Sequence, residues 1–301
     1  TNVPVGFDND ASYLGRVQRK AARALFAVPA EVSRIPDQEA FEYVTLLFLL
    51  RERNLRIISV WHPTFLTMLV KSMRQHLPTI IGDLESGTIR EAFAIDPDVR
   101  SDLTSQLGTH PSRARELREI DVSEPGYVSR IWPSLRVISC WTDGCSEPWT
   151  SELARWFPKA TIQGKGLVAT EGIVSFPFGP KGEKACAVRS HFLEFVDVES
   201  EEIRHAWDVE KGKTYAVVLT TSAGLYRYKL HDLVRVTGFF NQAPCLTFLS
   251  RDNLISDIVG EKLNGQHVGS CLRSLQEQMG ITLSFAMLAP TSTPPAPRYV
   301  L

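Results

Sequence analysis

The stretch LYRYKLHDLVRVTGF, residues 225–239, decides how the rest of this sequence is interpreted. Apolar and polar residues alternate in 225–230 and again in 233–239, which is the pattern of half-buried β-strands with a turn between them. We therefore expect a β-rich block that starts near Ala160 and ends in the segment GFFNQ at 238–242. Similar alternating runs within this block lie at 173–178, 185–188, 192–196 and 215–220.

The part of the chain ahead of this block predicts a layered α/β arrangement. Asp37 can cap a helix that runs to about Asn54, and this helix is apolar on nearly all sides, so we expect it to be buried. A strand at 135–140 leads through the turn TDG into a helix at 147–157, an order typical of α/β sheets. The other predicted elements are a buried strand at 56–61, a helix at 65–76, and two helices that begin at Asp96-Pro97 and His110-Pro111.

The part after the block predicts a small α+β unit. It contains a strand at 246–249, a helix at 266–279 that Gly280 ends, and a strand at 282–288. The proline-rich segment 290–297 predicts a loop, and residues 298–301 predict the start of a further strand. The predicted fold is therefore α/β, with a large mixed-sheet and β-rich domain at 1–240 and part of a small α+β domain at 241–301.

Composition narrows the classes of function. A net charge of −1 over 301 residues gives no broad positive field, so we expect no binding to nucleic acid. The five cysteines have no CxxC spacing, which argues against a disulfide framework or a zinc site and favours a reducing compartment. Residues 1–10 lack a signal-peptide pattern, and the longest apolar-rich run, 43–50, is too short to span a bilayer. We expect a cytoplasmic protein without membrane contact.

Four short stretches carry the candidate chemistry. They are VISCWTDG at 137–144, GLVATEG at 166–172, the stretch at 225–239, and LSRDN at 249–253 followed by GEKL at 260–263. Their order and spacing resemble the adenylate-forming superfamily, which includes acyl-CoA synthetases, peptide-synthetase adenylation domains and luciferase. With TTSAG at 220–224 ahead of it, the 225–239 stretch is similar to the Gretchen Hagen (auxin-responsive) acyl-acid–amido synthetase family. The resemblance covers essentially all of residues 41–301.

The resemblance implies ATP and Mg²⁺ as cofactors and assigns roles to the second stretch. Thr170 and Glu171 would be the catalytic pair, with Thr170 and the adjoining Ala169 against the α-phosphate. Glu171 would be the metal ligand, since a carboxylate is the hard oxygen ligand that Mg²⁺ prefers. Asp232 would accept hydrogen bonds from the two ribose hydroxyls.

The resemblance also implies roles for residues outside the second stretch. Asp143 and Gly144 would border the adenine, and Arg251 would lie beside the hinge between the large and small domains. Trp61 and Phe65 would line the pocket for the acyl substrate.

Each of these residues also has a purely structural interpretation. Thr170 with Glu171 is a common pair at a cap or on a surface, and Asp232 can cap a turn or pair with Arg235 or Lys229. By the same reasoning, Arg251-Asp252 is a solvated turn when it is taken alone. Trp61 and Phe65 are residue types found more often in a plain core.

Three departures from the family pattern stand out. Leu167 occupies the position of a tyrosine that stacks on adenine, so only van der Waals contact with the base remains. His231 stands where the family has glycine, which we interpret as a turn that tolerates a side chain rather than as a catalytic histidine. Residues 1–34 contain nothing like the Ser/Thr/Gly-rich phosphate loop expected ahead of Phe41. From this we expect the chain alone to bind ATP weakly and to form little acyl-adenylate.

The resemblance implies a two-step ligase that conjugates a carboxylic acid with an amino acid. The acid would form an acyl-adenylate, and an amine would then displace AMP. Two alternatives stay open at this point. The acceptor of the acyl group is a thiol, such as CoA or a carrier protein, or the chain is a degenerate family member that serves as a binding or scaffolding protein.

Overall fold

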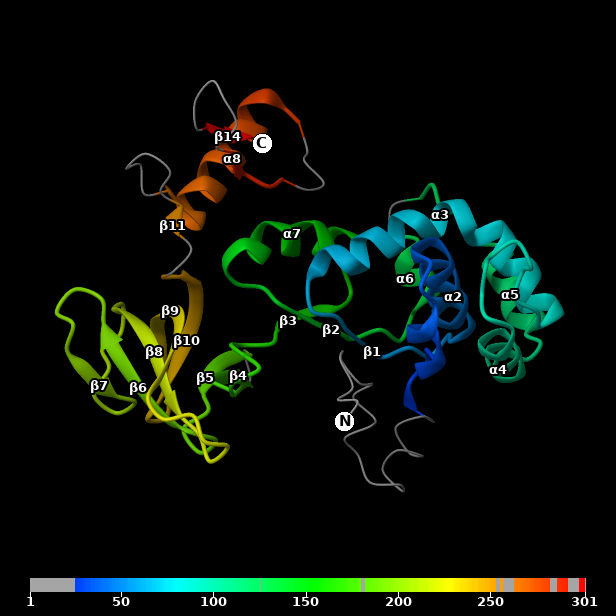
Figure 1. Cartoon of the computed structure of the whole chain (residues 1–301). Coiled ribbons are helices and arrows are strands. Elements are labelled where there is room, and N and C mark those ends of the chain that lie inside the picture. Colours follow the sequence, from blue (N-terminus) through cyan, green and yellow to red (C-terminus); the bar gives the residue numbers. More distant parts are fainter. Residues whose placement is uncertain are drawn as a thin grey trace. The chain divides into compact units, whose positions relative to one another are not determined.

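A computed structural model describes residues 25–124, 126–179, 182–252, 255–256, 263–281, 286–291 and 298–300. These residues form two compact units (Figure 1). The first unit comprises 25–60, 64–138 and 152–161, and the second comprises 61–63, 139–151 and the described residues from 162 onward.

The first unit is built around the helix α2, Gln38–Arg51. Asp37 caps it as predicted, because its carboxylate accepts a hydrogen bond from the backbone N–H of Ala40 at 2.8 Å. The helix is buried on nearly all sides, which confirms the interpretation of its apolar composition; its buried residues are Ala40, Tyr43, Val44, Leu46, Leu47, Phe48, Leu49 and Leu50. A short 3₁₀ helix, Ala30–Arg34, precedes it.

Helix α3, Pro63–Ser86, is longer than the predicted 65–76 because it continues through Pro78. A proline inside a helix removes one hydrogen bond. The residues that follow it, Ile80, Ile81 and Leu84, are buried, so packing of the apolar face carries the helix past the proline. Tyr43 and Asp83 tie α2 to α3 through a buried hydrogen bond of 2.7 Å.

The other helices of this unit begin where proline predicts. They are α4, Pro97–Leu107, and α5, Pro111–Arg118, each with proline in its first turn, followed by the short α6, Val128–Ile131. Arg113 on α5 is buried and donates to the carbonyl oxygens of Leu50 at 2.8 Å and Ile131 at 2.7 Å. These bonds connect α5 to the C-terminal ends of α2 and α6, where the last carbonyl groups of a helix have no partner within the helix.

A three-stranded sheet has the order β1-β2-β3, with β1 at Ile57–Ser59, β2 at Val137–Cys140 and β3 at Thr161–Gly164. The backbone N–H of Arg136 donates to Arg56, and that of Trp141 to Trp61, so the first two strands run parallel. Between β2 and β3 lie the 3₁₀ helix η3, Gly144–Ser146, and α7, Glu147–Trp156, as the strand–turn–helix pattern predicts. The expectation that β1 is buried is wrong: it is an edge strand, and only Ile58 of its three residues is buried.

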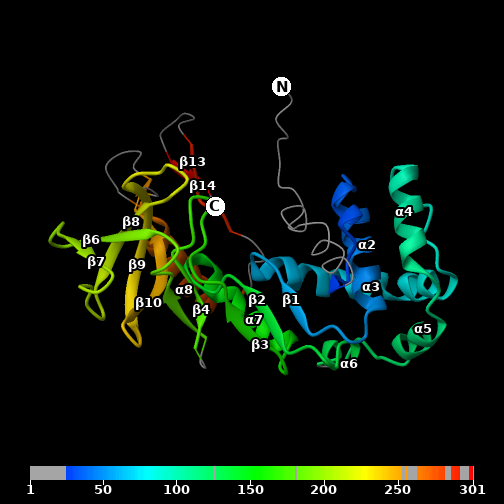
Figure 2. The same cartoon turned by 90° about the horizontal axis from the view of Figure 1, so that it is seen from below.

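The β-rich block is an antiparallel sheet of seven strands in the order β4-β5-β10-β9-β8-β6-β7. Figure 2 shows β8, β9 and β10 side by side in this sheet. Its hydrophobic core includes Phe195, Tyr215, Val217, Leu219 and Val234, all fully buried. The strands are β4 Ser175–Phe178, β5 Glu183–Cys186, β6 Phe192–Asp197, β7 Ile203–His205, β8 Thr214–Thr220, β9 Tyr228–Phe240 and β10 Ala243–Arg251.

Two expectations for this block need correction. The predicted strands at 225–230 and 233–239 fall into one strand, β9, which begins only at Tyr228. His231, with a φ of 64°, lies where the pairing of β9 with β8 shifts register. The segment 238–242 does not end the block, because Asn241 at φ 52° turns the chain directly into β10. The sheet therefore continues past residue 240 to Arg251, whereas the start of a small domain at 241 stays a prediction.

Beyond the sheet, the structure describes β11 Ile255–Ser256, β12 Leu263–Asn264, helix α8 Gly265–Met279, β13 Ala289–Thr291 and β14 Arg298–Val300. Gly280 at φ 63° ends α8 as predicted. The predicted strand at 282–288 is absent at 286–288, and 282–285 lie outside the described residues. The parallel and antiparallel sheets with helices confirm the α/β class. Within the described part of the chain, no helix has the length and apolar character needed to span a bilayer.

Candidate active site

Thr170 and Glu171 form the turn of a small hairpin, which we call the 170–171 turn. Ala169 and Gly172 exchange two backbone hydrogen bonds, 3.1 and 3.2 Å, and the backbone N–H of Val174 donates to a carbonyl across the hairpin. The two residues at the turn are therefore presented to solvent on a fixed backbone. The hydroxyl of Thr170 donates to a Glu171 carboxylate oxygen at 2.9 Å.

Asp232 lies within β9, where the register pairs it directly with Arg251 of β10. The guanidinium Nε of Arg251 lies 3.5 Å from Oδ1 of Asp232. The partner of Asp232 is therefore Arg251, and not Arg235 or Lys229 as in the structural alternative. Arg251 is the exposed last residue of β10, and Asp252 after it lies in a turn.

Glu171 lies close enough to Asp232 for its carboxylate to affect the pKa of Asp232. The pKa of Asp232 is raised to about 6, chiefly by burial; the Arg251 guanidinium lowers it, and the Glu171 carboxylate contributes to the rise. The pKa of Glu171 is lowered, first by the hydrogen bond from Thr170 and, more weakly, by Tyr228 and Arg251. The structure thus brings Thr170, Glu171, Asp232 and Arg251 together.

Tyr228 is a member of this group that the sequence did not single out. Its phenol oxygen lies 3.5 Å from Oε1 of Glu171, across 57 positions of sequence. The start of β9 holds it there, because the neighbouring Arg227, at φ 45°, pairs with the buried carboxylate of Glu194 at 3.1 Å. Tyr228 lies within the 225–239 stretch, so its place in this motif is the feature of the sequence that could have marked it as a site residue.

His231 also has a clear structural explanation. Its φ of 64° lies in the left-handed region, which favours glycine, the residue of the family pattern. Its Nδ1 lies 2.7 Å from Oδ1 of Asp252, and Lys229 contacts the other carboxylate oxygen of Asp252 at 3.1 Å. This fits the interpretation that the position tolerates a side chain.

Asp143 and Gly144 are fixed against β10. The carboxylate of Asp143 pairs with the ammonium of Lys184 and accepts from the backbone N–H of Phe248 at 3.2 Å. Gly144 has a φ of 59°, and a Cβ there would lie 3.0 Å from the ring of Phe248. These contacts give both residues a structural role, and their part in adenine binding stays a prediction.

Leu167 and Ala169 both pack against the hydrophobic core of the seven-stranded sheet.

Trp61 and Phe65 are 56% and 57% exposed, which excludes the alternative that they belong to a core. In the fourth stretch, Asn253 and residues 260–262 lie outside the described residues.

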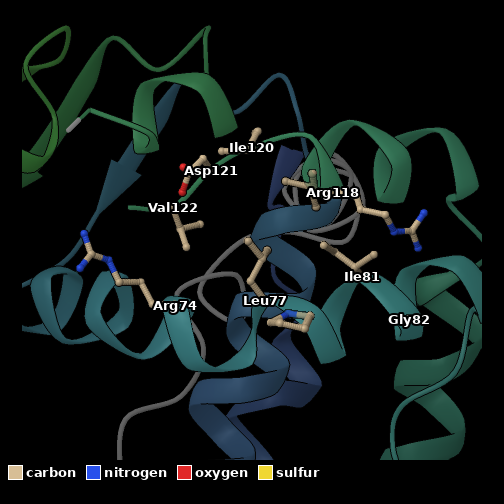
Figure 3. Close-up of a pocket in the computed structure, with 10 residues that line it drawn as sticks. Arg74, Leu77, Ile81, Gly82, Arg118, Ile120, Asp121 and Val122 are labelled. Atoms are coloured by element: carbon tan, nitrogen blue, oxygen red, sulfur yellow. The ribbon is translucent and has the colours of Figure 1, made fainter. Parts of the chain in front are cut away.

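The predicted residues line neither of the two cavities found in the first unit. One cavity of 430 Å³ lies against α3 and α5, and Figure 3 shows Leu77 and Val122 beside it with Arg74 and Arg118 on opposite sides. Another of 380 Å³ is lined by residues that include Tyr43, His76 and Arg90. The candidate site lies instead on the hairpin and strands of the second unit, where Thr170 is exposed and Asp232 is buried.

Comparison with known proteins supports the sequence resemblance. Residues 9–162 match the GH3 family N-terminal domain, and residues 185–251 match the GH3 family central domain. The 170–171 turn lies between these two segments, Asp143 lies in the first, and Asp232 and Arg251 lie in the second.

Relatives of this chain include two Arabidopsis thaliana proteins. Indole-3-acetic acid-amido synthetase GH3.3 is 26% identical over 300 residues, which cover 92% of this chain and 49% of the relative. Indole-3-acetic acid-amido synthetase GH3.4 is 25% identical over 300 residues, with 92% and 50% covered. The chain therefore spans about half the length of the curated relatives it matches.

The fold is also that of a solved family structure. The structure of GH3.15 acyl acid amido synthetase superposes with a TM-score of 0.74 at 20% sequence identity, covering 87% of this chain and 49% of that one. The two matched domains together extend over most of the sequence. This chain belongs to the GH3 family.

Proposed function

We propose that this chain carries the nucleotide-binding face of a ligase that joins a carboxylic acid to an amino acid through an acyl-adenylate. The observation that carries the proposal is the proximity of Glu171 and Asp232, with Thr170 and Arg251 beside them. One end of this group suits a phosphate and a divalent cation, and the other suits a pair of ribose hydroxyls. The names of the relatives support the same reaction.

In the first step, a carboxylate oxygen of the acid forms a bond to the α-phosphorus of ATP, and the bond to the β-phosphate bridging oxygen breaks. The products are the acyl-adenylate and pyrophosphate. In the second step, an amine attacks the acyl carbon, AMP leaves, and one proton is released. Because negative charge gathers on the phosphate during the first step, donors and cations beside it lower the barrier.

The residues present fit a magnesium ion that arrives with the nucleotide. Among the described residues, no three His, Cys, Asp or Glu side chains converge as they would in a protein-only metal cage. Mg²⁺ commonly binds through one or two carboxylates together with substrate phosphates and water, and Glu171 offers an accessible carboxylate of this kind. When bound there, the ion would neutralise phosphate charge.

The remaining roles follow from position. Thr170 and the backbone at Ala169 would contact the α-phosphate, Asp143 and Gly144 would border the base, and Trp61 and Phe65 would contact the acid. We also place the protein in the cytoplasm, where the free thiols of Cys140, Cys186, Cys245 and Cys271 would stay reduced.

Two substitutions in the complete natural protein test the site. Glu171→Ala should lower the rate of ATP–pyrophosphate exchange by about a hundredfold or more, because the metal loses its carboxylate ligand. Asp232→Ala should instead raise the KM for ATP by roughly 10- to 100-fold, the worth of a hydrogen bond to a charged group. Steady-state exchange kinetics measure both effects.

Glu91→Ala is the matched control, since Glu91 is an exposed glutamate of the first unit, and it should leave both parameters unchanged. Unchanged kinetics for Glu171→Ala and Asp232→Ala would end the site assignment. The absence of exchange with every carboxylic acid offered would favour the scaffold alternative. Release of AMP with CoA but with no amino acid would favour the thiol acceptor.

A further inference from the structure

Three side chains gather at the carboxyl ends of the parallel strands. Trp61 lies just beyond β1, Trp141 follows β2 directly, and Lys165 follows β3 directly. Two backbone hydrogen bonds align them: Trp141 N–H donates to Trp61 O at 2.8 Å, and Lys165 N–H donates to Cys140 O at 3.1 Å. In α/β sheets, ligands bind at this edge.

The side chains contact one another. The ring centroids of Trp61 and Trp141 are 5.5 Å apart, and the rings are inclined at 59°. The ammonium nitrogen of Lys165 lies 5.5 Å from the centroid of the Trp61 ring and 3.4 Å from the hydroxyl of Ser139. The backbone bond aligns Lys165 with the neighbouring strand, and the ring face and the hydroxyl are contacts of its ammonium group.

Both tryptophans nevertheless leave much of their surface in solvent. Trp61 is 56% exposed and Trp141 is 41% exposed, although indole rings are among the side chains that gain most from burial. Two adjacent exposed indoles beside a cation offer a flat apolar surface and one positive charge. A carboxylate with a flat or elongated apolar body complements both.

We propose that Lys165 binds the carboxylate of the acid to be activated, with Trp61 and Trp141 against its apolar body. This inference rests on the proposed function and deepens it. Lys165 lies five residues ahead of Thr170, on the strand end that leads into the 170–171 turn. One carboxylate oxygen would pair with the ammonium while the other attacks the α-phosphorus.

The change in charge of the acid during the first step determines which kinetic parameter should respond when Lys165 is replaced. The acid carries a full negative charge before the step and none once its oxygen is bonded to phosphorus. The ammonium of Lys165 therefore stabilises the bound acid more than the transition state. Its removal should raise the KM for the acid and should leave kcat unchanged or higher, but not lower.

The test uses ATP–pyrophosphate exchange by the complete natural protein with benzoate, phenylacetate, indole-3-acetate, 2,4-DB and octanoate. The acid with the highest kcat/KM is then used for the variants. Lys165→Met should raise the KM for that acid at least about tenfold, as expected for a lost charge-assisted hydrogen bond, while the KM for ATP stays unchanged. Lys165→Arg should recover most of the loss, because it keeps the charge over the indole.

Two further variants define the outcome. Trp141→Leu should weaken binding of the acid by losing the indole surface, and Lys159→Met, at an exposed lysine ahead of β3, should behave as wild type. If the wild type shows exchange but Lys165→Met changes the KM for the acid less than twofold, or changes the KM for ATP instead, the inference is wrong while the ligase stands. If no acid supports exchange by the wild type, the proposed function itself fails.

Discussion

Ionisation of the buried carboxyl group of Asp232 is unfavourable, and its surroundings compensate for this only in part. It is only 8% exposed, and its nearest cation, Arg251, lies at 3.5 Å, while the carboxylates of Glu171 and Asp252 act against its ionisation. Burial is the largest cause of its raised pKa of about 6. A carboxyl group held this way gains hydrogen bonds when two hydroxyls of a ligand approach it.

The raised pKa predicts how stability depends on pH. The pKa of Asp232 is about 6 in the folded chain and 3.8 as the reference value, so the folded state binds more protons between these values. Stability should therefore fall as pH rises from about 4 to about 7, by at most about 3 kcal/mol from this residue. Urea unfolding at a series of pH values measures this slope.

Asp232→Asn removes the titration, and its stability relative to wild type should rise across the same pH window. Asp102→Asn, at an exposed carboxylate of α4, is the control and should keep the wild-type slope. Parallel pH curves for wild type and Asp232→Asn would show that the carboxyl group of Asp232 is not perturbed by burial.

At the scale of elements, the hairpin that presents Thr170 and Glu171 depends on what lies beneath it. The backbone bonds between Ala169 and Gly172 close the turn, and the ring of His191 packs against Gly172. A Cβ at Gly172 would lie 2.7 Å from Cδ2 of that ring, closer than any ordinary contact. The glycine is therefore required by packing and not by a positive φ.

Gly172→Ala should destabilise the protein by about 1–3 kcal/mol, because the new methyl group overlaps the His191 ring. Gly172→Ala combined with His191→Ala should recover most of this loss, because the smaller side chain makes room. Urea unfolding measures both variants. Gly238→Ala, at a strand glycine with no atom within 4 Å of its Cβ position, is the control for the change from glycine itself. An equal loss in the single and double variants would contradict the packing explanation.

The sequence predicted those elements whose signals are local. Asp37 and the Pro97 and Pro111 pairs marked helix starts correctly, because caps and first-turn prolines act through neighbouring backbone groups. The predicted end of α3 was wrong because packing of the buried residues beyond Pro78 outweighs the hydrogen bond that the proline removes. The single strand β9 was missed because its register is set by β8 and β10, which no local pattern reports.

The candidate site divides in the same way. The resemblance supplied Thr170, Glu171 and Asp232, and the structure brings them together. Sequence alone did not reveal that Arg251 pairs with Asp232 or that Tyr228 approaches Glu171, because both contacts depend on strand register. Trp141 and Lys165 were equally hidden, since they meet only through the parallel arrangement of β1, β2 and β3.

At the scale of the whole molecule, each compact unit has a hydrophobic core of its own. In the first unit, Leu47 of α2 is fully buried, and so are Met73 and Ile80 of α3. In the second unit, Phe195 of β6 is fully buried among residues of β8 and β9. A loss of packing in one core should therefore lower local stability mainly within its own unit.

Leu47→Ala and Phe195→Ala test whether the two cores are energetically separate. Each substitution should cost about 2–5 kcal/mol, because a large buried side chain leaves a cavity. Hydrogen exchange should then rise in α2 and α3 for Leu47→Ala, and in β6, β8 and β9 for Phe195→Ala, while the other unit keeps its wild-type protection. Val198→Ala, at a side chain that is 46% exposed, should change neither. Faster exchange throughout the molecule in either core variant would mean that the chain unfolds as one cooperative body, since protection in both units would then report the same global opening.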